Sequence, residues 1–270
     1  MRRGLELSKI CFAVGMAGIG VLSFVYGDFA LQWQPVPKWV PWREGLAYVS
    51  GVFLLACGMG LLLKRLVALS ALALTIYVLS WVLLLQTPRV VAAPADVGAW
   101  LGFFENLALA GGGWIFFASA EVHGGGRSMG FASGENGVRI GTFLFAVSLP
   151  LFGLSHLMYA DFTASMVPAW LPQRVGFAYF TGAAHIAAGV GLLFGIVPRL
   201  AATLEAIMMG SFVCLVHIPG VAADPTSRLQ WTMLFIALAL TGSAWAVGSS
   251  LSGSPRDSRN LRRVAVTHRL

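Results

Sequence analysis

The sequence predicts an all-α membrane protein in which eight transmembrane helices form two tandem four-helix bundles, related as parallel repeats. Hydrophobic residues make up 57% of the 270 residues, the mean hydropathy is +0.78 and only 11% of residues are charged, whereas a soluble domain is about 25% charged. Eight apolar runs are each long enough to cross a hydrocarbon core of about 30 Å as a helix. In addition, much of the first half of the chain recurs in the second half at a constant offset in residue number.

The repeat is clearest where residues 36–62 return as residues 167–193, because 14 of the 27 aligned positions are identical without a gap. The same offset relates residues 100–114 to 231–245. We interpret the shared Val-Pro-x-Trp-x-Pro as a rigid elbow at the membrane boundary, where indole rings are common, and not as a ligand site. The repeated residues with a structural role are Pro37, Trp39, Pro41, Arg43 and Tyr48, which recur as Pro168, Trp170, Pro172, Arg174 and Tyr179.

The first apolar run, residues 10–26, follows two arginines and could also be a signal peptide. No convincing small-residue cleavage site ends it, and the Tyr-Gly-Asp-Phe at 26–29 recurs as Tyr-Ala-Asp-Phe at 159–162. The offset is larger by two there than in the rest of the repeat, so the following loop of the second half is shorter by two residues. We therefore expect this run to be kept as the first helix.

Each remaining run is predicted to be one helix, because backbone groups cannot stay unpaired in hydrocarbon. Proline-rich connectors at 35–41 and 168–172 should separate helices. Small residues at helical spacing should allow close helix packing, as at Ala47, Gly51 and Gly58, at Ala178, Gly182 and Gly189, and at Gly111 to Gly113. The eight runs are residues 10–26, 45–63, 66–86, 98–120, 139–158, 175–197, 200–218 and 229–248.

The basic residues predict the orientation. With the N-terminus in the cytoplasm, 13 of the 18 lysines and arginines lie inside and 5 outside, as the positive-inside rule favours. Four helices per half give both halves the same orientation, and we expect both termini in the cytoplasm of a bacterial cell, with the helices in its inner membrane. The expected domains are a first repeat at 1–120, a glycine-rich cytoplasmic linker at 121–137, a second repeat at 138–249, and a basic tail at 250–270 that rests on anionic lipid.

The charge of +7 does not indicate nucleic-acid binding, because the basic residues sit at helix ends and in the tail instead of forming one folded basic surface. The three cysteines stand singly in apolar runs, which is not the spacing of a redox or zinc motif. The oligomeric state is not indicated. The sequence therefore predicts the lipid bilayer as the first partner of this chain.

Ionisable residues within or beside apolar runs suggest a site, since charge is costly in hydrocarbon. We expect a pocket toward the outer leaflet around His185, with His156 and Arg174 from the second half and Glu105 from the first. The alternative is that Glu105 is simply protonated or hydrogen-bonded, that His156 and His217 lie at the interface, and that Glu205 reaches the cytoplasmic boundary or a basic partner. His156, His185 and His217 stand on three separate helices without ligand spacing, so no metal or haem site is expected.

Three segments resemble the DoxX-like family of four-helix membrane proteins: Gly-Leu-Ser-His at 153–156, Val-Pro-Ala-Trp-Leu-Pro at 167–172, and Tyr-Phe-Thr-Gly-Ala-Ala-His at 179–185. The resemblance covers nearly all of both halves and implies a tandem fusion of two such units. It implies membership in a family of which some members are linked to quinone-dependent electron transfer. His185 matches an ionisable position of the family pattern, whereas the first half has Leu54 there.

Two classes of function fit these observations. One is a membrane subunit that binds a quinone or lipid and supports a soluble redox partner, as an oxidoreductase subunit. The other is a non-enzymatic scaffold or carrier for lipid or protein. Neither a catalytic motif nor a cofactor motif separates them.

Overall fold

The computed structural model describes residues 2–124 and 130–251, and all regular structure in this part of the chain is helical. It confirms eight helices long and apolar enough to cross a membrane within these residues. The helices are α1 (Arg2–Tyr26), α2 (Arg43–Leu62), α3 (Val67–Trp81), α4 (Thr87–Ala92), α5 (Val97–Gly124), α6 (Gly134–Met158), α7 (Ala160–Met166), α8 (Arg174–Leu193), α9 (Pro198–Phe212), α10 (Ile218–Ala223) and α11 (Arg228–Leu251).

The third and seventh spans are longer than expected. They run to Ala92 and Ala223, past Pro88 and Pro219, whereas the apolar runs that predicted them end at residues 86 and 218. A π-helical turn joins α3 to α4 (η2, Val82–Gln86), and a second one joins α9 to α10 (η4, Val213–His217). The wider turn places each proline at the start of the next segment, where a missing amide hydrogen is tolerated. From α2 and α8 through α4 and α10, every matched element begins and ends at the same offset that relates the two halves of the sequence.

Neighbouring spans pack in the order α1, α2, α3, α5, α6, α8, α9 and α11, and α11 returns to pack along α1. Helices α5 and α11 also meet each other. One hydrophobic core contains buried side chains from both halves, among them Phe12, Leu54, Phe145 and Leu240. The two halves thus share a core, and the boundary between the expected domains does not separate two cores.

Glycines mark the closest crossings, which confirms the interpretation of the small residues as packing positions. A side chain on Gly20 or Gly51 would meet backbone where α1 crosses α2, and the same is true of Gly153 and Gly182 where α6 crosses α8. The three consecutive glycines of α5 face three different helices. They are Gly111 against Gly141 of α6, Gly112 against Ser243 of α11, and Gly113 against Thr75 of α3.

The segment between the halves is shorter than the expected linker, because α5 continues to Gly124 and α6 begins at Gly134. A 3-10 turn (η3, Gly130–Ala132) precedes α6. The expected linker glycines at 125 and 126 and the tail from residue 252 lie outside the described residues. Helix propensity and packing of α5 on α6 therefore extend both helices into a stretch that its glycine content had suggested was a loop.

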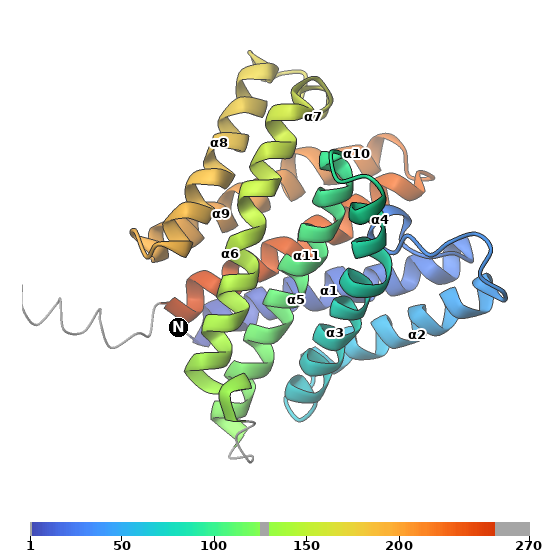
Figure 1. Cartoon of the computed structure of the whole chain (residues 1–270), viewed down its shortest axis with the longest axis vertical. Helices are drawn as coiled ribbons and strands as arrows, with labels where there is room; N and C mark the ends of the chain where they lie inside the picture. Colours follow the sequence, from blue (N-terminus) through green and yellow to red (C-terminus); the bar gives the residue numbers. More distant parts are fainter. Residues whose placement is uncertain (1, 125–129, 252–270) are drawn as a thin grey trace, which may run out of the picture.

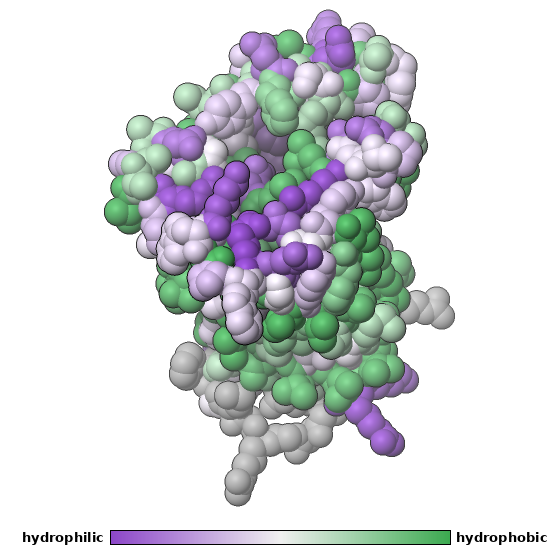
Figure 2. Space-filling view, turned by 90° about the vertical axis from the view of Figure 1, so that its right-hand side faces the viewer, coloured by the Kyte–Doolittle hydropathy of each residue, from purple (hydrophilic) through white to green (hydrophobic). Residues whose placement is uncertain are grey.

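The connections lie at two ends of the bundle (Figure 1). We call the end that carries residues 27–42, 93–96, 167–173 and 224–227 the loop end, and the end that carries residues 63–66 and 194–197 the turn end. Figure 2, which faces the side at which residues 27–42 lie, shows hydrophilic side chains gathered in a hollow, with hydrophobic side chains below them. The many exposed leucines, isoleucines, valines and phenylalanines of the helices are suited to contact with lipid.

Candidate functional site

The most deeply buried pair of ionisable side chains joins α8 to α9. Nδ1 of His185 lies 2.7 Å from Oε1 of Glu205, and the two residues are only 2% and 1% exposed. At this distance a proton lies between the two groups, whichever of them carries it. Oε2 of Glu205 has no hydrogen-bond partner within the described residues. An ionisable side chain buried alone in a membrane span would be costly, and the contact between His185 and Glu205 reduces this cost. The pair is therefore the strongest candidate for chemistry.

A second histidine lies against this pair. The rings of His156 and His185 are 5.0 Å apart and nearly perpendicular, and Nδ1 of His156 is 2.9 Å from Oγ1 of Thr181. The ring of Phe212 lies 6.0 Å from His156 and 6.1 Å from His185. The structure therefore brings together two of the four predicted pocket residues, on α6 and α8, with an aromatic wall from α9.

The matched positions in the first half are apolar. Leu54 and Leu74 align with His185 and Glu205 at the constant offset of the repeat, and both are fully buried. A leucine pair needs no hydrogen bond, whereas a lone histidine or glutamate there would be a buried polar group without a partner. Both members of the pair therefore differ together between the halves.

Glu105 does not lie in this cluster. Its carboxyl faces Trp33 of the short helix η1 (Leu31–Trp33), yet the two groups do not form a well-oriented hydrogen bond, because Oε2 of Glu105 and Nε1 of Trp33 are both without a partner in the described part of the chain. Its neighbour Asn106 donates to the Trp33 carbonyl at 3.1 Å. Glu105 therefore belongs to a separate polar cluster in the first half.

Arg174 is also apart from the histidines. It precedes His185 by 11 residues on α8, or roughly 16 Å at 1.5 Å per residue. It lines a surface pocket of about 610 Å³ with Asp161, Ser165 and Gln173 at the loop end. No ion pair joins Arg174 to Asp161 in the part of the chain that the structure describes.

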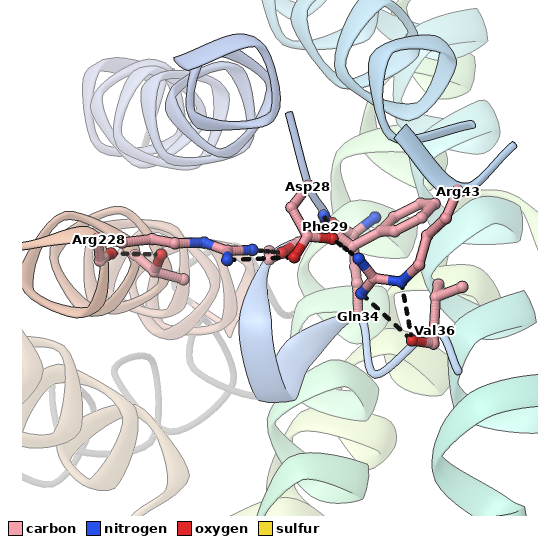
Figure 3. Close-up of polar contacts among 8 residues, drawn as sticks. Asp28, Phe29, Gln34, Val36, Arg43 and Arg228 are labelled. Carbon is pink, nitrogen blue, oxygen red and sulfur yellow. Dashed lines mark hydrogen bonds and ion pairs between the residues drawn. The ribbon is translucent and has the colours of Figure 1, made fainter. Parts of the chain in front are cut away.

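Its counterpart Arg43 is fully engaged (Figure 3). Asp28 accepts from Arg43 of α2 and, at 3.2 Å, from Arg228 of α11. Arg43 also donates to the Val36 carbonyl at 3.3 Å, and Arg228 donates to the Phe29 carbonyl. These contacts fasten the loop after α1 to two helices. The position that matches Arg228 in the first half is Val97, so Asp161 lacks the equivalent second cation.

The pKa of Asp28 lies below its ordinary value of 3.8. Partial burial by itself would raise this pKa, but the hydrogen bond from the Phe29 amide and the charges of Arg228 and Arg43 together outweigh it. The carboxylate is therefore the favoured form, and the contacts drawn in Figure 3 are those of a charged cluster.

The repeated elbow residues lie directly before α2 and α8. Val40 donates to the Pro37 carbonyl at 3.2 Å, and Leu171 donates to the Pro168 carbonyl at 3.0 Å. The residue before each helix, Trp42 or Gln173, has a left-handed backbone. Pro41 and Pro172 lie one residue earlier, Trp39 and Trp170 are exposed, Tyr179 is half exposed, and the hydroxyl of Tyr48 donates to Glu44.

The expected pocket included none of Thr181, Glu205 and Phe212. The repeat itself could have pointed to Glu205. In adjacent spans of the second half, Glu205 and His185 are the two ionisable residues whose matched positions in the first half are leucine. The pairing could have been proposed from that coincidence. Thr181 and Phe212 give no such signal, since serine and tryptophan occupy the matched positions of the first half.

Comparison with known proteins adds one similarity. Residues 145–247 match a family described as a domain of unknown function (DUF8561). No curated protein and no solved structure matches the chain. The matched stretch contains His156, His185 and Glu205, so it covers all three ionisable residues that meet in the second half.

Proposed function

We propose that this protein is an integral membrane subunit whose second half binds a lipid-soluble, quinone-like molecule. The observation that carries the proposal is the buried pair of His185 and Glu205 within membrane spans, 2.7 Å apart. Such a pair can take up or release a proton next to a bound ring. Electrons would have to come from a redox partner, for which a soluble subunit at the membrane surface is the simplest form.

The surroundings of the pair support this assignment. His156 and Thr181 are partly exposed while His185 and Glu205 are buried, so a path of polar groups leads from the edge of the bundle to the pair. Aromatic side chains flank it, and apolar rings suit the tails and rings of lipid-soluble molecules.

The test uses the residues of the first half as replacements. The chain is placed in nanodiscs, and binding of a short-chain benzoquinone is followed by quenching of tryptophan fluorescence. The double variant His185→Leu/Glu205→Leu recreates the matched pair Leu54 and Leu74, so it should stay folded. We expect its affinity to fall by about tenfold or more, since a hydrogen bond to a charged group is worth about 1.5 kcal/mol or more.

A matched control is Cys214→Ala, because Cys214 is exposed on α9's π-helical extension and outside the cluster. It should bind the benzoquinone as the unchanged protein does. Undiminished binding by the double variant would refute the proposed site. Absence of binding by the unchanged protein would favour the alternative function, a non-enzymatic scaffold or carrier.

We further propose that the two halves are parallel DoxX-like repeats in a bacterial inner membrane, with both termini cytoplasmic. Support comes from the 14 identities between residues 36–62 and 167–193, and from the element bounds that recur at the same offset. The 13 to 5 distribution of basic residues favours the orientation. The loop end would then face outward.

The orientation can be tested by cysteine labelling in a background without Cys11, Cys57 and Cys214. A cysteine placed at Trp39, which is 82% exposed, should react with an impermeant reagent added to intact cells. A cysteine at Lys64, in the turn between α2 and α3, should react only after the membrane is opened. The reverse pattern would overturn the orientation.

A further inference from the structure

Four matched positions at the loop end differ in burial between the halves. In the first half Ser23, Ser50, Trp81 and Gln86 are all buried, with exposures of 5% or less. The matched residues of the second half, His156, Thr181, Phe212 and His217, are all partly exposed. The two sets stand on corresponding helices. A segment of the first half therefore covers its set, and the set in the second half has no equivalent cover.

The cover in the first half is the loop after α1. Trp33 and Gln34 turn into the bundle and are 3% and 1% exposed. The Gln34 amide donates to Ser50 at 2.9 Å. The Gln86 amide donates to the carbonyls of Gln32 and Trp33 at 2.8 and 3.3 Å. The Gln34 carboxamide and the backbone carbonyls of Gln32 and Trp33 thus satisfy Ser50 and Gln86, two of the four residues, and the Trp33 indole is buried in the same loop.

The second half has no such insertion, because its loop is shorter and forms α7. That helix packs against α8, and its small side chains Ala160 and Ala164 contact Ala178 there. Nδ1 of His217, at the position of Gln86, has no hydrogen-bond partner within the described residues. The nitrogen is nevertheless shielded from solvent, so a partner of matching size would remove an energetic cost.

We propose that His156, Thr181, Phe212 and His217 bind a planar aromatic molecule with a neutral hydrogen-bonding group, in the place that Trp33 and Gln34 take in the first half. The inference rests on the proposed repeat and specifies the ligand class of the proposed function. The Phe212 ring offers an aromatic contact, and His217 offers the hydrogen bond. Arg174 lies some three turns of helix from the His185 level, so no cation in this set selects for an anion.

The probe follows from the internal template: indole-3-acetamide carries the same ring and amide as Trp33 with Gln34. It is titrated into the protein in nanodiscs, with the short-chain benzoquinone as competitor. We expect one site per chain, competition between the two, and affinity for indole-3-acetamide lowered about tenfold by His217→Leu, the equivalent of one lost hydrogen bond. His217→Gln, which restores the residue of the first half, should retain most of the affinity.

Cys214→Ala is the control, since Cys214 shares the π-helical turn with His217 but is exposed. Equal binding of the probe by the unchanged protein and His217→Leu would overturn the inference. If the benzoquinone binds but indole-3-acetamide neither binds nor competes, the inference is wrong and the proposed function stands. If indole-3-acetamide binds through His217 and the benzoquinone does not bind, the proposed function is wrong and this inference stands.

A second variant tests the template from the other half. Trp33→Ala removes the buried indole from the loop that covers Ser50 and Gln86, and should raise the number of indole-3-acetamide sites from one to two per chain. A single site in a folded Trp33→Ala protein would show that the loop end of the first half does not form the same binding site. It would overturn the comparison between the two loop ends. Where this variant fails to fold, the His217 comparison decides the matter.

Discussion

At matched positions, the interiors of the two halves differ in polarity, and their loop ends differ in exposure. Where the first half buries Leu54 and Leu74, the second buries His185 and Glu205 in direct contact. Where the first half covers its loop end with Trp33 and Gln34, the second leaves His156 and His217 partly exposed. The comparison teaches that matched positions carry different chemistry: the first half has leucine where the second buries an ionisable pair, and its loop end is covered where that of the second is partly exposed.

The largest expected effect comes from breaking the polar pair on one side only. His185→Leu leaves Glu205 buried without a partner, and should lower the free energy of unfolding by about 3 to 5 kcal/mol. Adding Glu205→Leu should restore stability to near that of the unchanged protein, because the pair then matches Leu54 and Leu74. Unfolding in mixed detergent micelles measures both. A double variant as unstable as the single one would contradict the interchangeability of the two interiors.

A smaller but still large effect should follow from removing the cover of the first half. Trp33 is 3% exposed, and truncation of a buried tryptophan costs about 3 kcal/mol or more. Trp170 is 71% exposed, so Trp170→Ala should change the free energy of unfolding by less than about 0.5 kcal/mol. The same unfolding assay compares them. Equal losses of unfolding free energy in the two variants would mean that the buried Trp33 side chain does not stabilise the fold more than the exposed Trp170 does.

The ion cluster at the loop end offers a third contrast. Asp28→Asn should cost about 1 kcal/mol at neutral pH, a figure reduced for the partial exposure of the site. Asp161→Asn should cost almost nothing, since no ion pair holds Asp161 within the described residues. Unfolding experiments on each variant beside the unchanged protein would measure this difference, and a larger loss for Asp161→Asn would reverse the comparison.

The pH dependence of the Asp28 effect has a defined sign. Because the folded pKa of Asp28 is lowered, its contribution is fully present above the ordinary pKa of 3.8 and is lost as pH falls through the folded pKa. The difference in stability between the unchanged protein and Asp28→Asn should therefore shrink below pH 3.8. A difference that instead grew in acid would show that Asp28 is not stabilised as a carboxylate.

A small effect is also expected at Glu105. Glu105→Ile restores the matched residue Ile236, and removes an oxygen that has no partner in the described structure. We expect a change in stability below about 1 kcal/mol and unchanged benzoquinone binding, because Glu105 lies with Trp33 and not with His185. A tenfold loss of binding would restore the single pocket that the sequence had suggested.

The sequence alone determined the eight membrane helices and their approximate bounds, because mean hydropathy over about 20 residues is a local property. It also determined the close helix crossings, since glycine and alanine at helical spacing allow backbones to approach whichever helix lies opposite. Gly51 and Gly182 were predictable on that ground. The continuation of two helices through Pro88 and Pro219 was not, because a π-helical turn is a small adjustment that hydropathy does not reveal.

Only the tertiary structure decided which ionisable groups meet. His185 and Glu205 stand on different helices, and His156 is on a third, so their contact depends on how α6, α8 and α9 pack around one core. The same holds for Glu105, which we had expected in one pocket with His185 and which lies beside Trp33 instead. Depth along a helix is readable from residue number, but the direction in which a side chain points is set by the neighbours that pack against it.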